Sequence, residues 1–192
     1  MMVETGEMKI EIRAERAGDE ASIREVGFLA FGDDGNICIV DVLRKSPSYD
    51  RELSLVSVIS DSIVGPDSIV GPDSIVGHIL FNPMVIRTPD GEVPALYLGP
   101  IAVRPELQRQ GIGSALMRAG LEKCREKGHR IVLLSGHPEY YPRFGFTPAR
   151  DRGLEAPEWI PDEAFMVLEL VPGALNGVRG TAIIPYEFPE SE

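Results

Sequence analysis

The sequence predicts a mixed α/β fold, in which strands form a central sheet and helices occupy a few fixed places between them. Apolar and charged residues alternate over residues 8–14, which is the pattern of a half-buried strand. Apolar residues recur at Ile112, Ala115, Leu116 and Ala119, the spacing of one helical face. Runs of neighbouring strands, broken by helices at these positions, indicate a mixed sheet.

The N-terminal half is predicted to start with a loose tail over residues 1–7. Asp19 is a candidate N-cap for the first helix, because its carboxylate can accept from free N–H groups of a helical first turn. Asn82-Pro83 is expected to interrupt a strand, because proline cannot donate to a ladder. The predicted elements are a strand at 8–14, a helix between Asp19 and Gly32, a helix at 36–45, and strands at 53–59 and 74–86.

The C-terminal half is predicted to alternate more often between the two kinds of element. Gly91 marks a turn, and Pro138 and Pro142 limit the segment between them to little more than one helical turn. The predicted elements are a strand at 98–103, a helix from 112 that ends by Gly128, a strand at 131–134, and strands near 165–171 and 180–184.

Composition excludes several classes of function. The chain has 192 residues and a net charge of −11, which argues against binding to a nucleic-acid backbone and is compatible with cationic substrates. A single domain is predicted over residues 8–192. Cys38 and Cys124 are expected in helices, without the spacing of metal ligands, and no metal site is predicted. With no signal-peptide pattern or long apolar run, the sequence predicts a cytoplasmic protein.

A six-residue repeat covers residues 61–78, as Asp-Ser-Ile-Val-Gly-Pro twice and then Asp-Ser-Ile-Val-Gly-His. One interpretation is a left-handed β-helix, because the repeats resemble those of hexapeptide acyltransferases. A solenoid needs more coils than these to bury a continuous core. The favoured interpretation is therefore a tandem insertion at 61–72 that lengthens a hairpin loop.

The most informative segment is Gln108-Arg109-Gln110-Gly111-Ile112-Gly113, which lies between a predicted strand and a predicted helix. A helix N-terminus offers unpaired N–H groups and partial positive charge, and glycine lets a backbone approach an anion closely. The segment lacks the Lys-Ser/Thr of a Walker A loop and the third glycine of a dinucleotide fingerprint. A phosphate-binding turn and an ordinary helix start both fit these residues taken alone.

The strand before this segment carries Gly99 and Pro100 in an otherwise regular apolar run. Proline cannot donate to a ladder, and a glycine inside a strand often marks a bulge or a close backbone approach. We therefore expect this strand to splay from its neighbour, which leaves free backbone groups and a slot for a ligand.

A second informative segment, residues 137–146, contains Tyr140-Tyr141 before Arg-Phe-Gly-Phe. The two segments together resemble the acetyl-CoA elements of the GNAT superfamily of N-acetyltransferases: (Gln/Arg)-x-x-Gly-x-(Gly/Ala) and Tyr-x-x-x-Gly-Phe. Residues 52–56, 76–81 and 161–180 further resemble bacterial acetyltransferases of the YhbS type. The resemblance implies a mostly antiparallel sheet with a splayed acetyl-CoA-binding strand and helices on both faces.

The resemblance also implies site residues. Tyr141 falls where the family places a tyrosine beside the thioester sulfur, as thiolate stabiliser or general acid. The base is not fixed by the resemblance. His78, Glu52, His137 and Glu139 are candidates from their residue types, with His78 or Glu52 preferred, and a water chain that ends at several carboxylates would also serve. The residues expected to bind acetyl-CoA are Ile101, Ala102, Val103, Gln108, Arg109, Gln110, Gly111, Ile112, Gly113, Ser114 and Tyr141.

The function implied is transfer of an acetyl group from acetyl-CoA, as co-substrate, to an amine of a small molecule or a protein. The amine would attack the thioester directly. An alternative is an acyl-CoA-binding sensor or interaction domain without turnover. No nucleic-acid or membrane partner is predicted, and a homodimer is possible.

Overall fold

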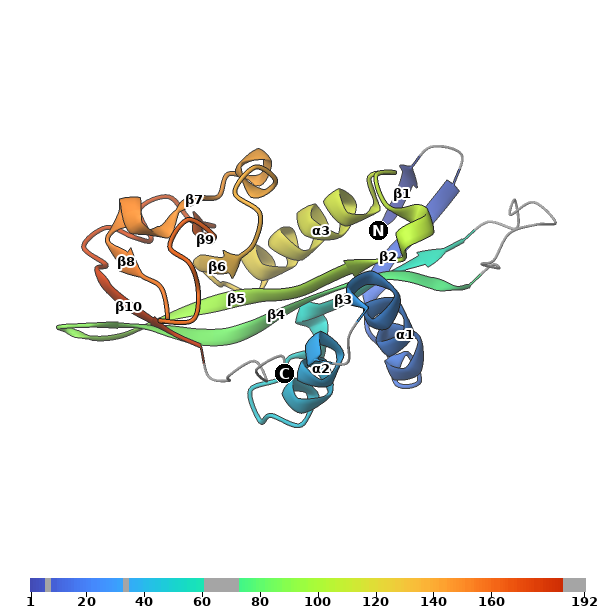
Figure 1. Ribbon diagram of the computed structural model, residues 1–192, viewed down its shortest axis with the longest axis horizontal. Helices are drawn as coiled ribbons and strands as arrows, with labels where there is room; N and C mark the ends of the chain where they lie inside the picture. The colour runs from blue at the N-terminus through green and yellow to red at the C-terminus, as the bar shows by residue number, and fades with distance from the viewer. Residues whose placement is uncertain (6–7, 33–34, 61–72, 185–192) are drawn as a thin grey trace. The chain divides into compact units, whose positions relative to one another are not determined.

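The computed structural model describes residues 1–5, 8–32, 35–60 and 73–184 (Figure 1). The chain divides into two compact units. The first unit contains the described residues of 1–80 and 100–120, and the second contains those of 81–99 and 121–184. The tandem insertion predicted at 61–72 lies outside the described residues.

The sheet of the first unit is antiparallel, in the order β1-β2-β3-β4. Its strands are β1 (Met2–Thr5), β2 (Met8–Ala14), β3 (Ser54–Ile59) and the first part of β4 (Ile75–Thr88). The expectation of a loose segment at 1–7 is wrong for β1, which pairs with β2 from Met2↔Glu11 to Thr5↔Met8. The segment is too short for its pattern of apolar and polar residues to distinguish a short edge strand from a loose tail.

Helices cover both faces of this sheet (Figure 1). They are α1 (Glu20–Phe31), α2 (Gly35–Arg44) and the start of α3 (Ile112–Glu126). Gly77 and His78 are neighbours on β4 and so face opposite sides. A Cβ on Gly77 would lie 2.9 Å from Leu116 Cδ1 of α3, whereas His78 lines a pocket together with residues of α1 and α2.

Asp19 stands at the N-cap position of α1, but its side chain does not cap the helix. Its carboxylate instead accepts from Arg13 Nη1 at 2.6 Å and from the backbone N–H of Arg16 at 2.7 Å. The predicted start of the helix is confirmed, but the predicted hydrogen bond from the first helical turn to the Asp19 carboxylate is wrong. The charged Arg13 competes for the same carboxylate oxygen atoms.

The second unit contains the end of β4 and the first part of β5 (Gly91–Val103), with β6 (Ile131–Ser135), β9 (Phe165–Glu169) and β7 (Thr147–Pro148) following β5 in that order. β10 (Gly180–Ile183) pairs with β4 and with β8 (Leu154–Glu155). Among the described strands, the β5–β6 and β8–β10 pairings are parallel, and the β1–β2, β2–β3, β3–β4, β4–β10, β6–β9 and β7–β9 pairings are antiparallel. The predicted mixed and mostly antiparallel sheet is thereby confirmed.

The predicted interruption of β4 at Asn82-Pro83 is wrong, since the strand continues to Thr88. The Asn82 side chain donates to the Gly99 carbonyl of β5 at 3.2 Å, which ties the two strands together beside the proline. Short 3-10 turns complete the chain. They are Arg51–Leu53, Pro105–Leu107, Tyr141–Phe144 and Ala149–Arg152.

Each unit has its own apolar core. Fully buried side chains of the first unit include Ile10, Leu53, Ile59, Ile79 and Leu116. Those of the second unit include Phe81, Ile86, Leu96, Phe146 and Phe165. Packing of this kind holds the turns described below in defined positions.

Candidate active site

The glycine-containing turn lies at the surface of the first unit, immediately before α3. Residues 108–111 are exposed, and Ile112 is buried beneath them. The Gly111 carbonyl accepts the Ala115 N–H at 2.9 Å and so starts the helix. The first turn of α3 carries no acidic side chain, so the positive end of the helix dipole meets no carboxylate of its own.

The backbone of this turn alternates in handedness. Arg109 has φ 63° and Gly111 has φ 91°, and Gln110 between them is not left-handed. Alternating conformations of this kind direct successive N–H groups toward one side, which makes a concave site for an anion. A non-glycine residue in the left-handed region costs about 1–2 kcal/mol, and such strain gathers at functional loops. The exposed turn at residues 108–111, with its alternating backbone, therefore has a form that fits a pyrophosphate.

Two glutamine side chains brace the turn. Gln108 Nε2 donates to the Val103 carbonyl at 3.0 Å, and Gln110 Nε2 donates to the Glu106 carbonyl at 3.4 Å. These contacts fix the path of the chain from β5 into α3. Neither glutamine is placed as a direct ligand by these bonds, and both act on the shape of the turn.

Arg104 lies between β5 and the turn, and its guanidinium forms ion pairs with two glutamates. Its guanidinium donates to Glu25 at 3.0 Å and to Glu106 at 2.7 Å, and its side chain is 11% exposed. The Arg104 pKa is raised, because the bonds to Glu106 and Glu25 together outweigh desolvation by burial. Arg104 therefore offers little charge to an anion at this turn, which leaves the backbone N–H groups and the exposed Arg109.

The strand predicted to splay is β5, which is longer than the predicted 98–103. Its parallel register with β6 runs from Leu96↔Val132 to Leu98↔Leu134. Gly99 and Pro100 follow directly after the last pair of this register. Ile101, Ala102 and Val103 continue the strand, and Ile101 is half-buried.

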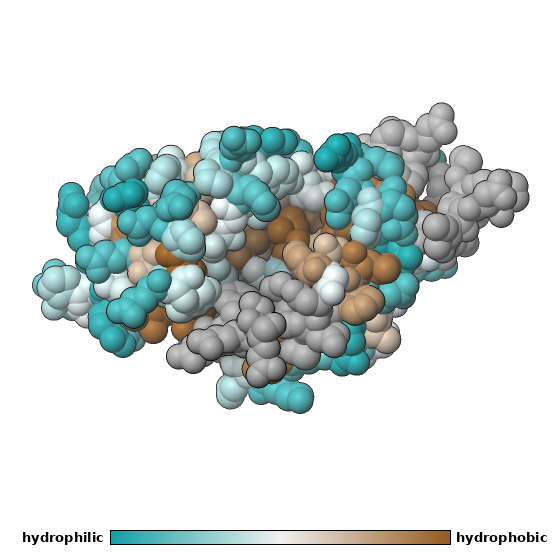
Figure 2. All heavy atoms as spheres, in the orientation of Figure 1, coloured by the Kyte–Doolittle hydropathy of each residue, from teal (hydrophilic) through white to brown (hydrophobic). Residues whose placement is uncertain are grey.

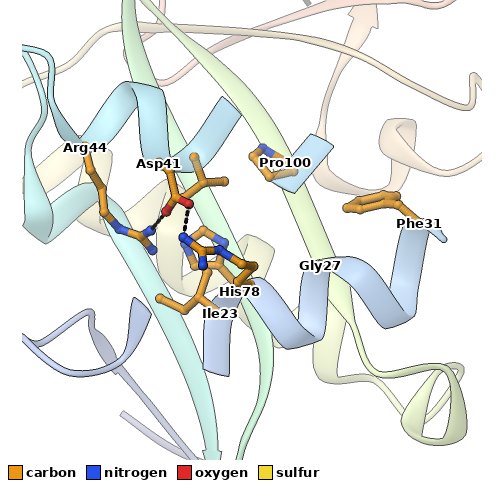
Figure 3. Close-up of a pocket in the computed structure, with 10 residues that line it drawn as sticks. Ile23, Gly27, Phe31, Asp41, Arg44, His78 and Pro100 are labelled. Atoms are coloured by element: carbon orange, nitrogen blue, oxygen red, sulfur yellow. Dashed lines mark hydrogen bonds and ion pairs between the residues drawn. The ribbon is translucent and has the colours of Figure 1, made fainter. Parts of the chain in front are cut away.

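A small pocket of the first unit opens between α1, α2 and the strands (Figure 3). Apolar residues form much of its lining, and two arginines and one aspartate add charge. Figure 2 shows hydrophobic residues gathered over α1, and Phe31 is 38% exposed at this helix. The lining residues are Ile23, Arg24, Gly27, Phe31, Val40, Asp41, Arg44, His78, Pro100 and Ala102.

His78 is the titratable ring in this pocket. It is 2% exposed, and Ser54 Oγ lies 2.8 Å from its Nε2. Burial lowers the His78 pKa to about 4, and the nearby Glu15 charge opposes this shift only in part. The ring is therefore neutral at pH 7 and has one nitrogen with a free electron pair.

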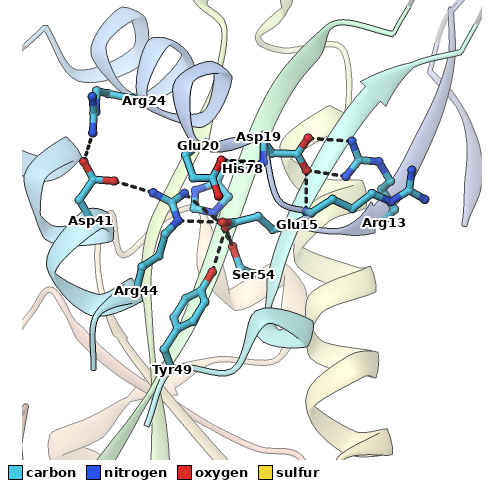
Figure 4. A network of polar contacts seen from close by, with 12 residues as sticks. Arg13, Glu15, Asp19, Glu20, Arg24, Asp41, Arg44, Tyr49, Ser54 and His78 are labelled. Carbon is cyan, nitrogen blue, oxygen red and sulfur yellow. Dashed lines mark hydrogen bonds and ion pairs between the residues drawn. The ribbon is translucent and has the colours of Figure 1, made fainter. Parts of the chain in front are cut away.

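A polar network connects His78 to neighbouring side chains, among them the pocket-lining residues Arg24, Asp41 and Arg44 (Figure 4). Ser54 Oγ donates to Glu15 Oε2 at 2.6 Å, and Tyr49 donates to the same oxygen at 2.9 Å. Arg44 Nε contacts Glu15 Oε1 at 2.7 Å, and Arg44 Nη1 contacts Asp41 at 2.6 Å. Asp41 in turn pairs with Arg24 of α1.

Tyr141 lies in the second unit, where it begins the 3-10 turn Tyr141–Phe144. Its ring is buried and packs edge-on against Tyr140 at 5.1 Å and Phe146 at 6.0 Å between centroids. Within the described part of the chain, its hydroxyl makes no hydrogen bond. Burial, with a smaller effect of Tyr140, raises the Tyr141 pKa to about 12.

The two preferred candidates for the base, His78 and Glu52, differ in their position relative to the pocket. His78 lines the pocket, whereas Glu52 is exposed on the 3-10 turn before β3 and is not among the lining residues. The sequence did not point to Glu15, Ser54 or Gly136. In the alternating pattern of this segment, Glu15 falls on a polar position, where an exposed side chain is expected. Strand β2 ends at Ala14, however, and the side chain of Glu15 is buried.

Within the part of the chain that the structure describes, no group of three or more His, Cys, Asp and Glu is placed to hold a metal ion. None of its helices is both long and apolar enough to cross a membrane.

Comparisons with known proteins give one consistent result. Residues 45–149 match the acetyltransferase (GNAT) domain family. The uncharacterized N-acetyltransferase YjhQ of Escherichia coli K12 is 38% identical over 149 residues, which cover 76% of this chain and 74% of YjhQ. YhbS of the same strain is 30% identical over 142 residues, which cover 72% of this chain and 84% of YhbS.

Solved structures agree with these relatives. Escherichia coli YhbS in complex with CoA is similar at a TM-score of 0.79 and 25% identity, covering 94% of this chain and 92% of that one. A GNAT acetyltransferase of Brucella melitensis in complex with acetyl-CoA is similar at a TM-score of 0.69 and 30% identity, covering 91% and 95%.

Proposed function

Because the chain belongs to the GNAT family of acetyltransferases, we propose that it transfers the acetyl group of acetyl-CoA to an amine by direct attack on the thioester. The acceptor is an amine of a small molecule or of a protein. The observation that carries the proposal is the pocket whose lining includes the neutral ring of His78 together with Pro100 and Ala102 of β5.

Acetyl-CoA is the co-substrate, and its pyrophosphate binds at the turn before α3. Two observations support this assignment: the left-handed residues Arg109 and Gly111, and the helix start free of acidic side chains. Gln110, Ile112, Gly113 and Ser114 contribute backbone to the same cradle. Ile101, Ala102 and Val103 offer backbone groups to the pantetheine arm.

The reaction forms a C–N bond and breaks a C–S bond. As the amine nitrogen attacks the carbonyl carbon, it becomes positively charged and more acidic, and its proton passes to the free electron pair of His78. The electron pair of the C–S bond leaves on sulfur as a thiolate. Glu52 is less suited to accept the proton, because it is exposed and lies outside the pocket lining.

Tyr141 stabilises the leaving thiolate by donating a hydrogen bond, and it keeps its proton. Its pKa is raised to about 12, whereas a thiol has a pKa near 8.5. Full proton transfer from Tyr141 to sulfur would therefore be uphill by about 5 kcal/mol. A hydrogen bond that strengthens as charge develops on sulfur needs no such transfer.

The proposal is tested by incubating the purified protein with acetyl-CoA and a panel of amines, and by following thiol release and the acetylated product. The panel includes amino acids, polyamines and peptides with free N-termini. His78→Gln is compared with Glu52→Gln, a matched carboxylate-to-amide control. We expect product with at least one amine, loss of turnover in His78→Gln and retention in Glu52→Gln.

Tight acetyl-CoA binding without any product across the panel would favour the alternative function, an acyl-CoA sensor. The reverse pattern, in which Glu52→Gln abolishes turnover and His78→Gln does not, would assign the base to Glu52. Each result is interpreted on protein whose fold is checked by circular dichroism.

A further inference from the structure

The buried contacts behind the pocket form a single chain of hydrogen bonds that ends on His78. Glu15, Ser54 and His78 are 2%, 0% and 2% exposed. Ser54 Oγ lies 2.6 Å from Glu15 Oε2 and 2.8 Å from His78 Nε2, so one hydroxyl connects the carboxyl group to the ring (Figure 4).

Glu15 is ionised in this setting. Burial raises its pKa, but the bonds from Arg44, Ser54 and Tyr49 together lower it below the usual value. Arg44 contacts both carboxylate oxygens, Oε1 at 2.7 Å and Oε2 at 3.3 Å. An ionised carboxylate only accepts hydrogen bonds, so the short contact to Ser54 requires that the hydroxyl donates to Glu15.

This direction fixes the remaining proton. A serine hydroxyl has one hydrogen, which is used toward Glu15, so its oxygen can only accept from the ring. Nε2 of His78 must therefore carry hydrogen. In the neutral ring, the other nitrogen, Nδ1, then holds the free electron pair. The opposite arrangement would leave two oxygen atoms 2.6 Å apart with no hydrogen between them.

We propose that Glu15, acting through Ser54, holds His78 in the tautomer with hydrogen on Nε2 and so makes Nδ1 the proton-accepting atom of the pocket. Glu15 and Ser54 are positioning residues, since they act on the ring and not on the substrate. The catalytic consequence rests on the proposed function, in which His78 takes the proton of the amine. The tautomer itself does not depend on that function.

The same chain supports the ring after it has accepted a proton. The imidazolium keeps its Nε2 hydrogen bond to Ser54, and the negative charge of Glu15 lies one hydroxyl away. The ring can therefore gain a proton without a rearrangement of its neighbours. Burial, which lowers the His78 pKa to about 4, opposes this charge, and the negative charge of Glu15 offsets the opposition in part.

The test is nitrogen-15 NMR of the full chain labelled at histidine. The chain has three histidines, and His78→Gln identifies the signals of residue 78. At pH 7, we expect Nε2 to show the shift and the one-bond proton coupling of a protonated ring nitrogen, and Nδ1 to show the shift of an unprotonated one. A hydrogen on Nδ1 in the unaltered protein would overturn the proposal, whatever its activity.

Variants then test the cause. Ser54→Ala removes the hydroxyl that links Glu15 to His78. In this variant, we expect the His78 ring to populate both tautomers, with hydrogen partly on Nε2 and partly on Nδ1. Tyr49→Phe is the matched control, because it removes the bonds of the Tyr49 hydroxyl to Glu15 and Ser54 and leaves the Glu15–Ser54 and Ser54–His78 bonds in place. Unchanged His78 signals in folded Ser54→Ala would overturn the role of the chain. If that variant does not fold, Glu15→Gln provides the second test by the same readout.

Kinetics separate this inference from the proposed function. Where the tautomer changes in Ser54→Ala, we expect kcat to fall on the order of 10- to 100-fold with little change in the acceptor KM. A changed tautomer with unchanged kcat would leave the inference about the ring intact and would remove His78 as the base.

Discussion

Gly136 provides the space in which the ring of Tyr141 lies. A Cβ built on residue 136 would fall within van der Waals overlap of the ring and 3.0 Å from the Tyr141 hydroxyl oxygen. Both residues belong to the second unit, where Gly136 follows β6 and its N–H donates to the Ala164 carbonyl at 3.0 Å. The position of the hydroxyl thus depends on the absence of a side chain at residue 136.

Gly136→Ala should therefore displace Tyr141 without removing its hydroxyl. We expect kcat to fall by up to about 100-fold, since small misplacements near a reacting centre can have such effects. Stability should fall by about 1–3 kcal/mol from overpacking. Steady-state kinetics and urea unfolding measure the two effects. In the double variant with Tyr141→Phe, the losses should not add, and additive losses would show that Gly136 acts elsewhere.

Tyr141→Phe removes only the hydroxyl of this residue. If the hydroxyl stabilises the leaving thiolate, kcat should fall on the order of 100-fold while the Kd of acetyl-CoA changes little. Stopped-flow detection of thiol release and calorimetric titration with acetyl-CoA measure the two quantities. Unchanged kcat in a folded variant would leave Tyr141 as a packed aromatic residue only.

Gly111→Glu places a carboxylate where the pyrophosphate is proposed to bind. We expect the affinity for acetyl-CoA to fall by roughly 100-fold or more, because like charges at such short range repel by several kcal/mol. Gly111→Ala is the matched control, since it carries the same strain at φ 91° without the charge. Its loss should be about tenfold or less. Equal losses in both variants would attribute the effect to backbone strain.

Acid should destabilise the first unit through His78. The His78 pKa falls from 6.5 to about 4 on folding, so the unfolded chain binds the proton more readily than the folded one. The stabilising effect of the neutral ring is fully present above pH 6.5 and is lost as the pH falls toward 4, by about 3 kcal/mol in total. Glu15, whose pKa is also lowered, adds a further loss at lower pH.

Urea unfolding of the unaltered chain and of His78→Gln between pH 7 and pH 4 tests this linkage. The slope of unfolding free energy against pH should be smaller in the variant over that interval. Equal slopes would mean that the buried ring does not control the acid response.

Local patterns in the sequence were sufficient for the elements and for the turn before α3. The motif with Gly111 and Gly113 lies within a few residues of the preceding strand, so it can be recognised without knowledge of distant contacts. The helix begins at Ile112, as predicted. Between Pro138 and Pro142 the chain forms only a turn at residues 138–140 before the 3-10 turn Tyr141–Phe144 begins, which is within the limit that the two prolines set. The family follows from the same local motifs and is confirmed by the relatives.

Pairings between distant segments could not be predicted. Glu15 is buried because Arg44, Tyr49 and Ser54 converge on it from up to 39 residues away. The sequence shows it as one more charge on an alternating strand. The requirement for glycine at residue 136 could not be predicted either, because it arises from the Tyr141 ring, which occupies the space where a Cβ of residue 136 would lie. Such requirements exist only in the assembled structure.

The ion pairs of Arg104 have a consequence for how the proposed phosphate site responds to its surroundings. With that guanidinium engaged by Glu25 and Glu106, the positive potential at the turn before α3 comes from the exposed Arg109 and from the main chain. Amide groups of the main chain have neither a protonation state nor rotamers. The contribution of these amide groups to the proposed phosphate site is therefore independent of pH, and Gln108 and Gln110 affect the site through the curvature of the turn that they support.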